Sequence, residues 1–324
     1  MTRPVKHPDG HPDAPRRRTR LAPSPTGALH LGNARTFIAT WALARQNGWS
    51  IALRVEDLDG PRVKPAATQQ ALDDLAWLGL DFDDGPLIQS TRRAVHADAL
   101  RQLIDRRAVY PCVCSRKEIE TAASAPHAED GSAVYPGTCR DRPAGAAEAA
   151  RAPAWRFRVP SSSFSFDDQI AGRRTFDLAR QIGDFIVAKA DGTPAYQLAV
   201  VVDDVDAGVT DVLRGDDLLD SVPRQTLLYE ALGHADAVPR YWHLPLVVGP
   251  DGRRLAKRHG DTRISAYCAA GVPAERVLAW AARSLGIETG DHITASEIRE
   301  RFRADQVPRG AVVFSDADDR ALRA

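Results

Sequence analysis

The sequence predicts an α/β protein built around a doubly wound parallel sheet and followed by a small helical region. Two observations lead to this prediction. Strand and helix patterns alternate over residues 19–108, an order that is typical of parallel sheets. Over residues 261–324 apolar side chains recur at helical spacing instead, for example Val277, Leu278 and Trp280, and later Ile298 and Phe302.

The elements of the first half follow from changes in periodicity. Residues 19–22 form a short apolar strand that leads into a turn rich in Pro and Gly. Apolar residues then recur at helical spacing up to Gly48 and alternate as a strand over 51–55. Helical spacing returns around Leu75, with Gly79 as the expected C-terminal cap, and again around Leu103.

The second half is less regular. Residues 109–153 are broken by Cys, Pro, Gly and an Ala-rich stretch, and strand patterns resume at 155–159 and 164–166. Residues 186–190 and 195–202 flank Asp191-Gly192, which predicts a β-hairpin. The remaining patterns predict a helix over 218–232, a short buried strand over 244–248 and a polar loop over 249–260.

Length and charge limit the classes of protein to which the sequence can belong. The chain of 324 residues can hold two or three domains. Its 43 basic and 43 acidic residues give a net charge of zero, and 38 of the basic residues are arginine. Such an arginine excess can reflect genomic composition alone. A neutral chain is not a globally basic nucleic-acid binder, so any RNA contact must come from a local arginine-rich surface.

Membrane and secreted classes are disfavoured. No apolar run approaches the roughly 18–20 residues that span a bilayer. Residues 1–18 lack the apolar core of a signal peptide and are predicted to be a disordered tail. Four cysteines are too few for a disulfide framework in a chain of this size. The sequence therefore predicts a cytoplasmic protein with no membrane contact.

The loop from Arg20 to Arg35 has the composition of a phosphate site. A strand ends in a turn stiffened by Pro23 and Pro25, and His30 and Gly32 follow at the start of a helix. Free backbone N–H groups and the positive helix end favour a phosphate there. Glycine permits close approach, and histidine adds a donor. An ordinary βα loop is the alternative interpretation.

This loop resembles the first signature of the class I aminoacyl-tRNA synthetases, the HIGH motif, here His30-Leu31-Gly32-Asn33. The flanking residues, Arg20 to Gly27, are similar to the glutamyl branch. Asn33 replaces the final histidine, and it can donate a hydrogen bond but cannot carry a proton. The resemblance implies a Rossmann-type catalytic domain in which His30, Gly32 and Asn33 bind ATP and His30 acts in catalysis.

A second segment, Gly249 to Arg258, resembles a degenerate KMSKS loop. Its counterpart of the motif is Arg254–Arg258, with Ala256 and Arg258 in place of the two serines. The resemblance implies that Arg254, Leu255 and Lys257 bind ATP. It also implies that Lys257 is catalytic, stabilising the charge that develops at the α-phosphate. A merely basic surface loop is the alternative.

A free amino acid with an acidic side chain presents two carboxylates and one ammonium group. Arginine reads carboxylates in a bidentate manner, and Glu56 ends a strand, where α/β sites commonly lie. By resemblance to the glutamyl family, the predicted glutamate pocket is Arg20, Ser24, Glu56, Tyr196 and Arg214, with Glu56 as the ammonium ligand. The alternatives are a solvated acidic strand end for Glu56 and core packing for Tyr196. Which arginine reads which carboxylate stays open.

Three cysteines have the spacing of a structural zinc site. Zinc prefers four S or N ligands, and Cys112, Cys114 and Cys139 supply three. The fourth ligand is either Tyr135 or His127, and resemblance to a subgroup of glutamyl-like synthetases favours Tyr135. Three free thiols are the alternative. The resemblance thus implies one Zn²⁺ in an inserted, acceptor-like subdomain.

Chain length indicates which branch of the glutamyl family the sequence resembles. Only 66 residues follow Arg258, too few for the anticodon-binding region of a full glutamyl-tRNA synthetase. The chain is most similar to glutamyl-queuosine tRNA(Asp) synthetases, short paralogues that activate glutamate with ATP and Mg²⁺. They transfer it to the queuosine base at the wobble position of tRNA-Asp. The alternatives are a truncated enzyme acting on tRNA-Glu and a catalytically inactive tRNA-binding paralogue.

The resemblance also implies a domain division and a set of partners. We expect a monomer that binds glutamate, ATP and queuosine-containing tRNA-Asp. After the tail of residues 1–18, the expected order is the first catalytic half, the inserted zinc-containing subdomain, the second catalytic half and a helical region that contacts the tRNA stem. Their expected bounds are 19–108, 109–194, 195–260 and 261–324.

Overall fold

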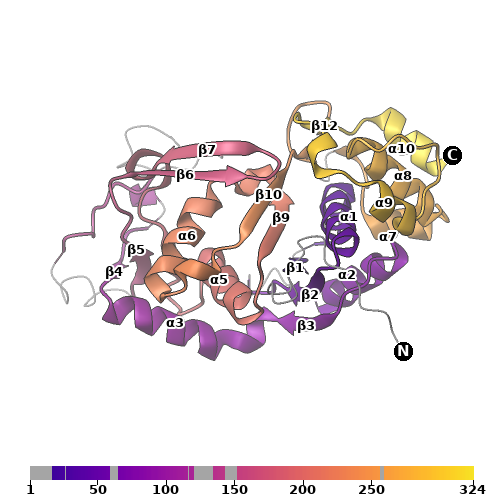
Figure 1. Cartoon of the computed structure of the whole chain (residues 1–324). Helices are drawn as coiled ribbons and strands as arrows, with labels where there is room; N and C mark the ends of the chain where they lie inside the picture. Colours follow the sequence, from indigo (N-terminus) through magenta and orange to yellow (C-terminus); the bar gives the residue numbers. More distant parts are fainter. Residues whose placement is uncertain are drawn as a thin grey trace, which may run out of the picture.

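The computed structural model describes residues 17–25, 27–58, 65–115, 117–119, 134–142, 152–255 and 259–324. Most of the predicted tail lies outside these residues, as do Lys257 and His127. A parallel sheet occupies the centre of the molecule, with an antiparallel part on one side and a helical part on the other (Figure 1). No helix in the described part of the chain combines the length and apolar character needed to cross a bilayer.

The central strands pair in parallel, as the sequence predicts. Two parallel ladders lie next to each other, because the Thr210 amide donates to the Arg18 carbonyl at 2.8 Å and the Arg18 amide donates to Thr210 Oγ1 at 2.8 Å. One ladder has the order β1-β2-β3 and the other joins β9 to β10. Their bounds are β1 Arg18–Leu21, β2 Ser50–Val55, β3 Asp84–Ile88, β9 Asp211–Gly215 and β10 Arg240–Leu244.

Helices connect these strands and cover the sheet. The most buried of them, α1, begins after His30 and ends before Gly48, whose φ of +67° favours glycine. The connecting helices are α1 Leu31–Gln46, α2 Pro65–Trp77, α3 Arg93–Asp105, α5 Tyr196–Asp206 and α6 Ser221–Leu232. Short helical turns complete the connections: η2 Gln89–Arg92, η3 Leu178–Ile182, η4 Asp216–Leu218, η5 Ala235–Ala237 and η7 Ala304–Gln306.

The predicted hairpin around Asp191-Gly192 is wrong in its second strand. The turn itself forms, with the Gly192 amide donating to the Lys189 carbonyl at 2.9 Å. The first strand is β8, Ile186–Ala188, but its return pairing is a single bridge from Ala188 to Pro194. The apolar run that follows is the buried helix α5. The sequence did not reveal this, because periodicity over so short a run does not separate a strand from a helix.

An antiparallel region follows α3. Three strands pair in the order β4-β5-β8, and a separate hairpin joins β6 to β7. Phe166 of this hairpin stacks on Phe176, with ring centroids 6.3 Å apart, and meets Tyr241 of β10 edge to face. The hairpin therefore packs on the central sheet. The bounds are β4 Val109–Cys112, β5 Ala154–Phe157, β6 Ser163–Asp168 and β7 Gly172–Asp177.

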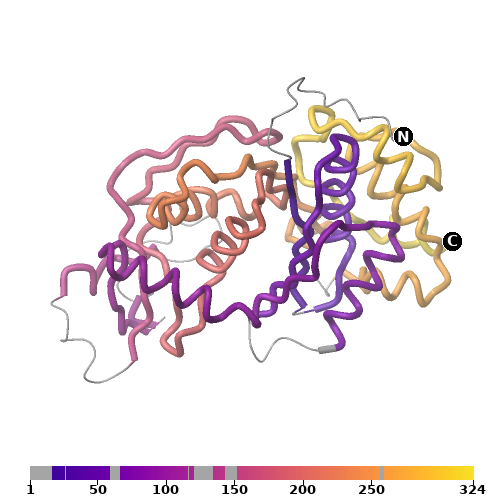
Figure 2. The backbone as a smooth tube through the Cα atoms, turned by 60° about the horizontal axis from the view of Figure 1, so that its bottom comes forward, coloured from indigo at the N-terminus to yellow at the C-terminus, as the bar shows by residue number. Residues whose placement is uncertain are grey.

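The C-terminal region is helical, as predicted, and packs against α1 (Figure 2). Its helices are α7 Ile264–Ala269, α8 Ala274–Ser284, α9 Ala295–Arg301 and α10 Asp316–Arg323. The strand predicted over 244–248 is interrupted: β10 ends at Leu244, and β11, Val247–Val248, pairs instead with β12, Val312–Val313. This pairing joins the C-terminal region to the chain just before residues 249–260.

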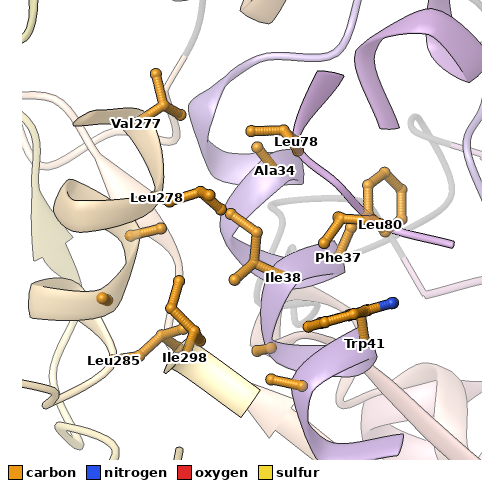
Figure 3. Packing of buried hydrophobic residues seen from close by; sticks show 14 of the residues in the cluster. Ala34, Phe37, Ile38, Trp41, Leu78, Leu80, Val277, Leu278, Leu285 and Ile298 are labelled. Atoms are coloured by element: carbon orange, nitrogen blue, oxygen red, sulfur yellow. The ribbon is translucent and has the colours of Figure 1, made fainter. Parts of the chain in front are cut away.

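The largest core cluster spans the sheet and the C-terminal helices. Ile38 on α1 points toward Leu278, Leu285 and Ile298, while Phe37 lies on another side of the same helix (Figure 3). Burial of each such side chain contributes about 1.5–3 kcal/mol. The helical region is therefore part of the same hydrophobic core as the central sheet.

A buried arginine joins the same parts of the chain. Arg35 of α1 donates to Ser284 Oγ at 2.9 Å, to the Ser284 carbonyl at 3.1 Å and to the Pro245 carbonyl at 2.7 Å. Burial lowers the pKa of its guanidinium to about 10, which leaves it charged near neutrality. One side chain thus links α1, the end of α8 and the segment between β10 and β11.

Candidate active site

A cavity of about 380 Å³ opens where β1, β2 and β9 end and α1 begins. Carboxyl ends of parallel strands are where α/β proteins commonly bind ligands. Nine of the predicted site residues line it: Arg20, Ser24, His30, Gly32, Asn33, Glu56, Tyr196, Arg214 and Arg254. Leu255 is instead buried in the core cluster, and Lys257 lies outside the described residues.

The first signature forms the N-terminal cap of α1. Nδ1 of His30 accepts from the Gly32 amide at 3.1 Å, and Asn33 Oδ1 accepts from the His30 amide at 3.3 Å. Burial, together with the nearby Arg254, lowers the pKa of His30 to about 4, so the ring is neutral near pH 7. Since Nδ1 accepts, the proton resides on Nε2, which is free to donate.

Gly32 is needed for this cap. A Cβ at position 32 would lie 3.0 Å from His30 Cε1 and 3.1 Å from Nδ1, which is too close for an undisturbed ring. A larger residue would therefore displace the histidine and weaken the cap. The helix start would lose both its side-chain acceptor and the open space beside its amides.

Glu56 follows β2 directly and is held by an arginine of that strand. Arg54 donates to Glu56 Oε1 at 3.0 Å from Nη2 and at 3.3 Å from Nε, and its Nη1 also pairs with Asp204. The Glu56 side chain is only 13% exposed, unlike a solvated strand end. The pKa of Arg54 is raised, since its pairing with the two carboxylates outweighs burial. The ion pair therefore holds the Glu56 side chain in one position at the edge of the cavity.

Two buried arginines from adjacent strands approach the cavity. Arg20 of β1 donates to the Leu213 carbonyl at 3.4 Å, and its Nε lies 3.7 Å from Asp204 Oδ1. Arg214 of β9 is 4% exposed. Tyr196, the first residue of α5, is 38% exposed, so it is not a core side chain. These groups place positive charge and a hydroxyl beside the Glu56 carboxylate.

Arg254, the described start of the second signature, lines the same cavity as the first signature. The Leu31 amide donates to the Thr262 carbonyl at 3.0 Å, and the Ile264 amide donates to the Leu29 carbonyl at 2.9 Å. These bonds hold the chain after residue 259 against the start of α1. Arg254 donates to Asp217 Oδ2 at 2.7 Å, and its side chain is 58% exposed. The two predicted ATP segments therefore border one cavity.

Sequence reasoning missed several lining residues, including Arg35 and Asp217. Asp217 is the second residue after β9, so the rule that pointed to Glu56 at the end of β2 would also have found it. Arg35 lies about one helical turn beyond Leu31 and Gly32, so helical spacing puts it near the same face of α1.

The predicted cysteine cluster is assembled. The sulfur atoms of Cys112, Cys114 and Cys139 lie within 4.8 Å of one another, and Cys114 and Cys139 are 3.5 Å apart. Tyr135 Oη lies 3.4 Å from the sulfur of Cys112 and 3.5 Å from that of Cys114. A tetrahedral zinc site with Zn–S bonds of about 2.3 Å has edges of about 3.8 Å. The four side chains therefore fit zinc in size and chemistry.

An arginine supports this cluster from outside. Nε of Arg156 lies 3.3 Å from the Cys112 sulfur, and its guanidinium stacks 3.9 Å from the centre of the Tyr135 ring. A cation at this place offsets the negative charge of thiolate ligands.

The fold and the site define a class of protein. Residues 17–318 match the family described as "tRNA synthetases class I (E and Q), catalytic domain". A solved glutamate tRNA ligase from Elizabethkingia meningosepticum, in complex with its amino acid, is similar with a TM-score of 0.80 and 26% identity. The similarity covers 94% of this chain and 68% of that one. The chain is thus a class I synthetase catalytic domain of the glutamyl and glutaminyl type.

Curated relatives narrow the family further. The "Glutamyl-Q tRNA(Asp) synthetase" of Rhodopirellula baltica is 50% identical over 83% of this chain and 84% of its own. That of Symbiobacterium thermophilum is 46% identical over 90% and 94%. The "Glutamate--tRNA ligase" of Geobacter sulfurreducens is 40% identical over 92% of this chain but only 63% of its own. The chain belongs to the glutamyl-Q tRNA(Asp) synthetase family.

Proposed function

We propose that the protein activates glutamate with ATP and transfers the glutamyl group to the queuosine base of tRNA-Asp. The observation that carries the proposal is the single cavity in which Arg20, Arg214 and Glu56 face the His30 end of α1. This arrangement offers two cations for carboxylates, one anion for an ammonium group and a helix start for phosphate. The names of the curated relatives support the choice of acceptor.

Glutamate binding uses the charged groups at the strand ends. Arg20 and Arg214 pair with the carboxylates, Glu56 accepts from the α-ammonium group, and Ser24 and Tyr196 border the same pocket. Arg54 keeps the Glu56 side chain oriented. Because these side chains are fixed before the substrate arrives, little ordering remains to oppose binding.

Adenylate formation uses the other half of the cavity. The glutamate carboxylate attacks the α-phosphate of ATP in line, forming glutamyl-adenylate and releasing pyrophosphate. The Nε2 N–H of His30 donates to a phosphate oxygen, the positive end of α1 lies beside it, and Arg254 and Lys257 add positive charge. Mg²⁺ accompanies ATP as part of the substrate.

Transfer then requires a hydroxyl of the queuosine ring to attack the acyl carbon of the adenylate, with AMP as the leaving group. Asn33 can donate but cannot take a proton, so we assign no base to it. Orientation of the two reactants and stabilisation of the leaving phosphate are the contributions of the protein.

The cysteine cluster is a structural zinc site in this proposal. Cys112, Cys114, Tyr135 and Cys139 hold the ion, which would stabilise the local fold and take no part in the reaction. The pKa of Cys114 is raised to about 11, mainly by burial, so binding must displace protons. Zinc analysis of purified wild type and Cys139→Ser tests the site. We expect one equivalent in the wild type, and an equal content in both would contradict the assignment.

The decisive experiment uses tRNA-Asp from cells with and without queuosine. We expect the protein, ATP and labelled glutamate to label only the queuosine-containing tRNA, and periodate treatment of that tRNA to abolish labelling. Labelling of tRNA-Glu instead would identify a truncated glutamyl-tRNA synthetase. A folded protein without glutamate-dependent ATP–pyrophosphate exchange would identify an inactive tRNA-binding paralogue.

A further inference from the structure

Arg214 is held by a buried chain of polar side chains. Its Nε donates to His243 Nε2 at 2.9 Å, and His243 Nδ1 lies 2.6 Å from Asp168 Oδ2. Asp168 and Arg214 are each 4% exposed, and His243 is fully buried. None of the sequence motifs includes Asp168 or His243.

The turn between β6 and β7 fixes the far end of this chain. Asp168 Oδ1 accepts from the amides of Ile170 at 3.0 Å, Ala171 at 2.7 Å and His243 at 3.0 Å. The carboxylate therefore has backbone donors on one oxygen and the imidazole on the other. Its position is set by two elements, the hairpin and β10.

The hydrogen bonds that join Arg214, His243 and Asp168 allow only one arrangement of protons. A carboxylate only accepts and a guanidinium only donates, so His243 must donate from Nδ1 and accept at Nε2. Burial is the main reason that the pKa of His243 is lowered to about 4, and the nearby Arg214 adds to it despite the bond to Asp168. A protonated ring would place two donors face to face at Arg214 Nε.

The remaining bonds of Arg214 leave it able to bind a substrate. Nη1 donates to Gln225 Oε1 at 2.9 Å and Nη2 donates to the Leu218 carbonyl at 3.1 Å. A guanidinium has five N–H donors, so each terminal nitrogen keeps one for a ligand in the cavity. Tyr241 packs against the guanidinium, 5.2 Å from its ring centre.

We propose that Asp168 and His243 are positioning residues for amino-acid recognition, because they hold Arg214 in the orientation that reads a substrate carboxylate. This inference rests on the proposed function. It gives the β6–β7 hairpin a role in substrate selectivity, although the hairpin contributes no side chain to the lining of the cavity.

Asp168→Asn tests the proposal with almost no change in shape. Either orientation of the amide opposes a donor to a donor, at the His243 ring or at the backbone amides. Asp167→Asn is the matched control, because this exposed neighbour on the same hairpin pairs with the exposed Arg173 and lies outside the buried chain. We expect Asp168→Asn to raise the glutamate KM in pyrophosphate exchange about tenfold. The ATP KM should stay within about twofold, as should both constants in the control.

Two substitutions of His243 separate positioning from folding. His243→Gln can present an acceptor to Arg214, whereas His243→Asn can present only a donor to Asp168. We expect His243→Gln to have a lower glutamate KM than His243→Asn. It should also discriminate better against free glutamine as a substrate, while the two variants have similar melting temperatures. Equal glutamate KM values for the two variants, or an unchanged value in Asp168→Asn, would overturn the proposal. If the wild type itself lacks glutamate-dependent exchange, the proposed function fails instead.

Discussion

The two sides of the cavity are built differently. On the glutamate side, Arg214 is 4% exposed and three of its N–H groups are bound by protein acceptors. On the proposed ATP side, the side chain of Arg254 is 58% exposed and bonds to Asp217, whose side chain is 26% exposed. The difference suggests a division of work. In the proposed function, selectivity for the amino acid rests on buried, preorganised groups, and phosphate binding rests on exposed cations and the positive end of α1.

The largest expected effect tests the buried side. Arg214→Gln should lower kcat/KM for glutamate about 1000-fold, because it removes the cation and leaves the His243 acceptor without its donor. Steady-state pyrophosphate exchange measures it. Arg224→Gln on α6, a partly buried arginine paired with Asp220, is the control and should change little. Comparable losses in both variants would remove the special role of Arg214.

Acid should lower the free energy of unfolding, because His243 is buried as a neutral ring on the glutamate side of the cavity. Its pKa is lowered from 6.5 to about 4, so the unfolded chain takes up this proton first as pH falls. Stability is therefore present above pH about 6.5 and is lost as pH falls toward about 4. Urea unfolding at pH 7 and pH 4 should show a loss about 3 kcal/mol larger in the wild type than in His243→Gln. Equal losses would mean that this histidine is not buried as a neutral ring.

Lys257 tests the ATP side. Lys257→Ala should lower kcat for pyrophosphate exchange about 100-fold and leave the glutamate KM unchanged, since the lysine is assigned to charge that develops in the transition state. The melting temperature should not move. Lys189→Ala is the matched control, because Lys189 lies in the turn after β8 and does not belong to either ATP signature. Normal exchange in Lys257→Ala would exclude the lysine from the mechanism.

The smallest expected effect comes from Arg254. Because this arginine is exposed and its charge is screened, Arg254→Ala should raise the ATP KM no more than about tenfold, and less at high salt. Arg253→Ala changes the adjacent exposed arginine and serves as its control. A large effect on the glutamate KM would break the division between the two sides.

Local patterns identified the elements that depend on neighbouring residues. The helix start at His30 and the turn at Gly192 follow from short-range geometry, and the structure contains both. The spacing of the cysteines anticipated a cluster whose sulfur atoms lie within 4.8 Å. Such features are predictable because few conformations satisfy them.

Long-range partners were not predictable in the same way. Asp168 and His243 are 75 residues apart, and only the packing of the β6–β7 hairpin on β10 brings them together. The strand predicted over 195–202 failed because its apolar run is buried on all sides as helix α5. Both cases depend on tertiary burial, which composition and periodicity do not encode.

The Arg35 junction has a consequence for unfolding. Its guanidinium is surrounded by three neutral oxygens, two from the end of α8 and one from the segment after β10. If α8 moved away, two of these acceptors would leave and a cation would remain buried with one partner. The C-terminal helices and the central sheet should therefore open together as one cooperative unit, so that amides in α1 and α8 share a single hydrogen-exchange protection limit.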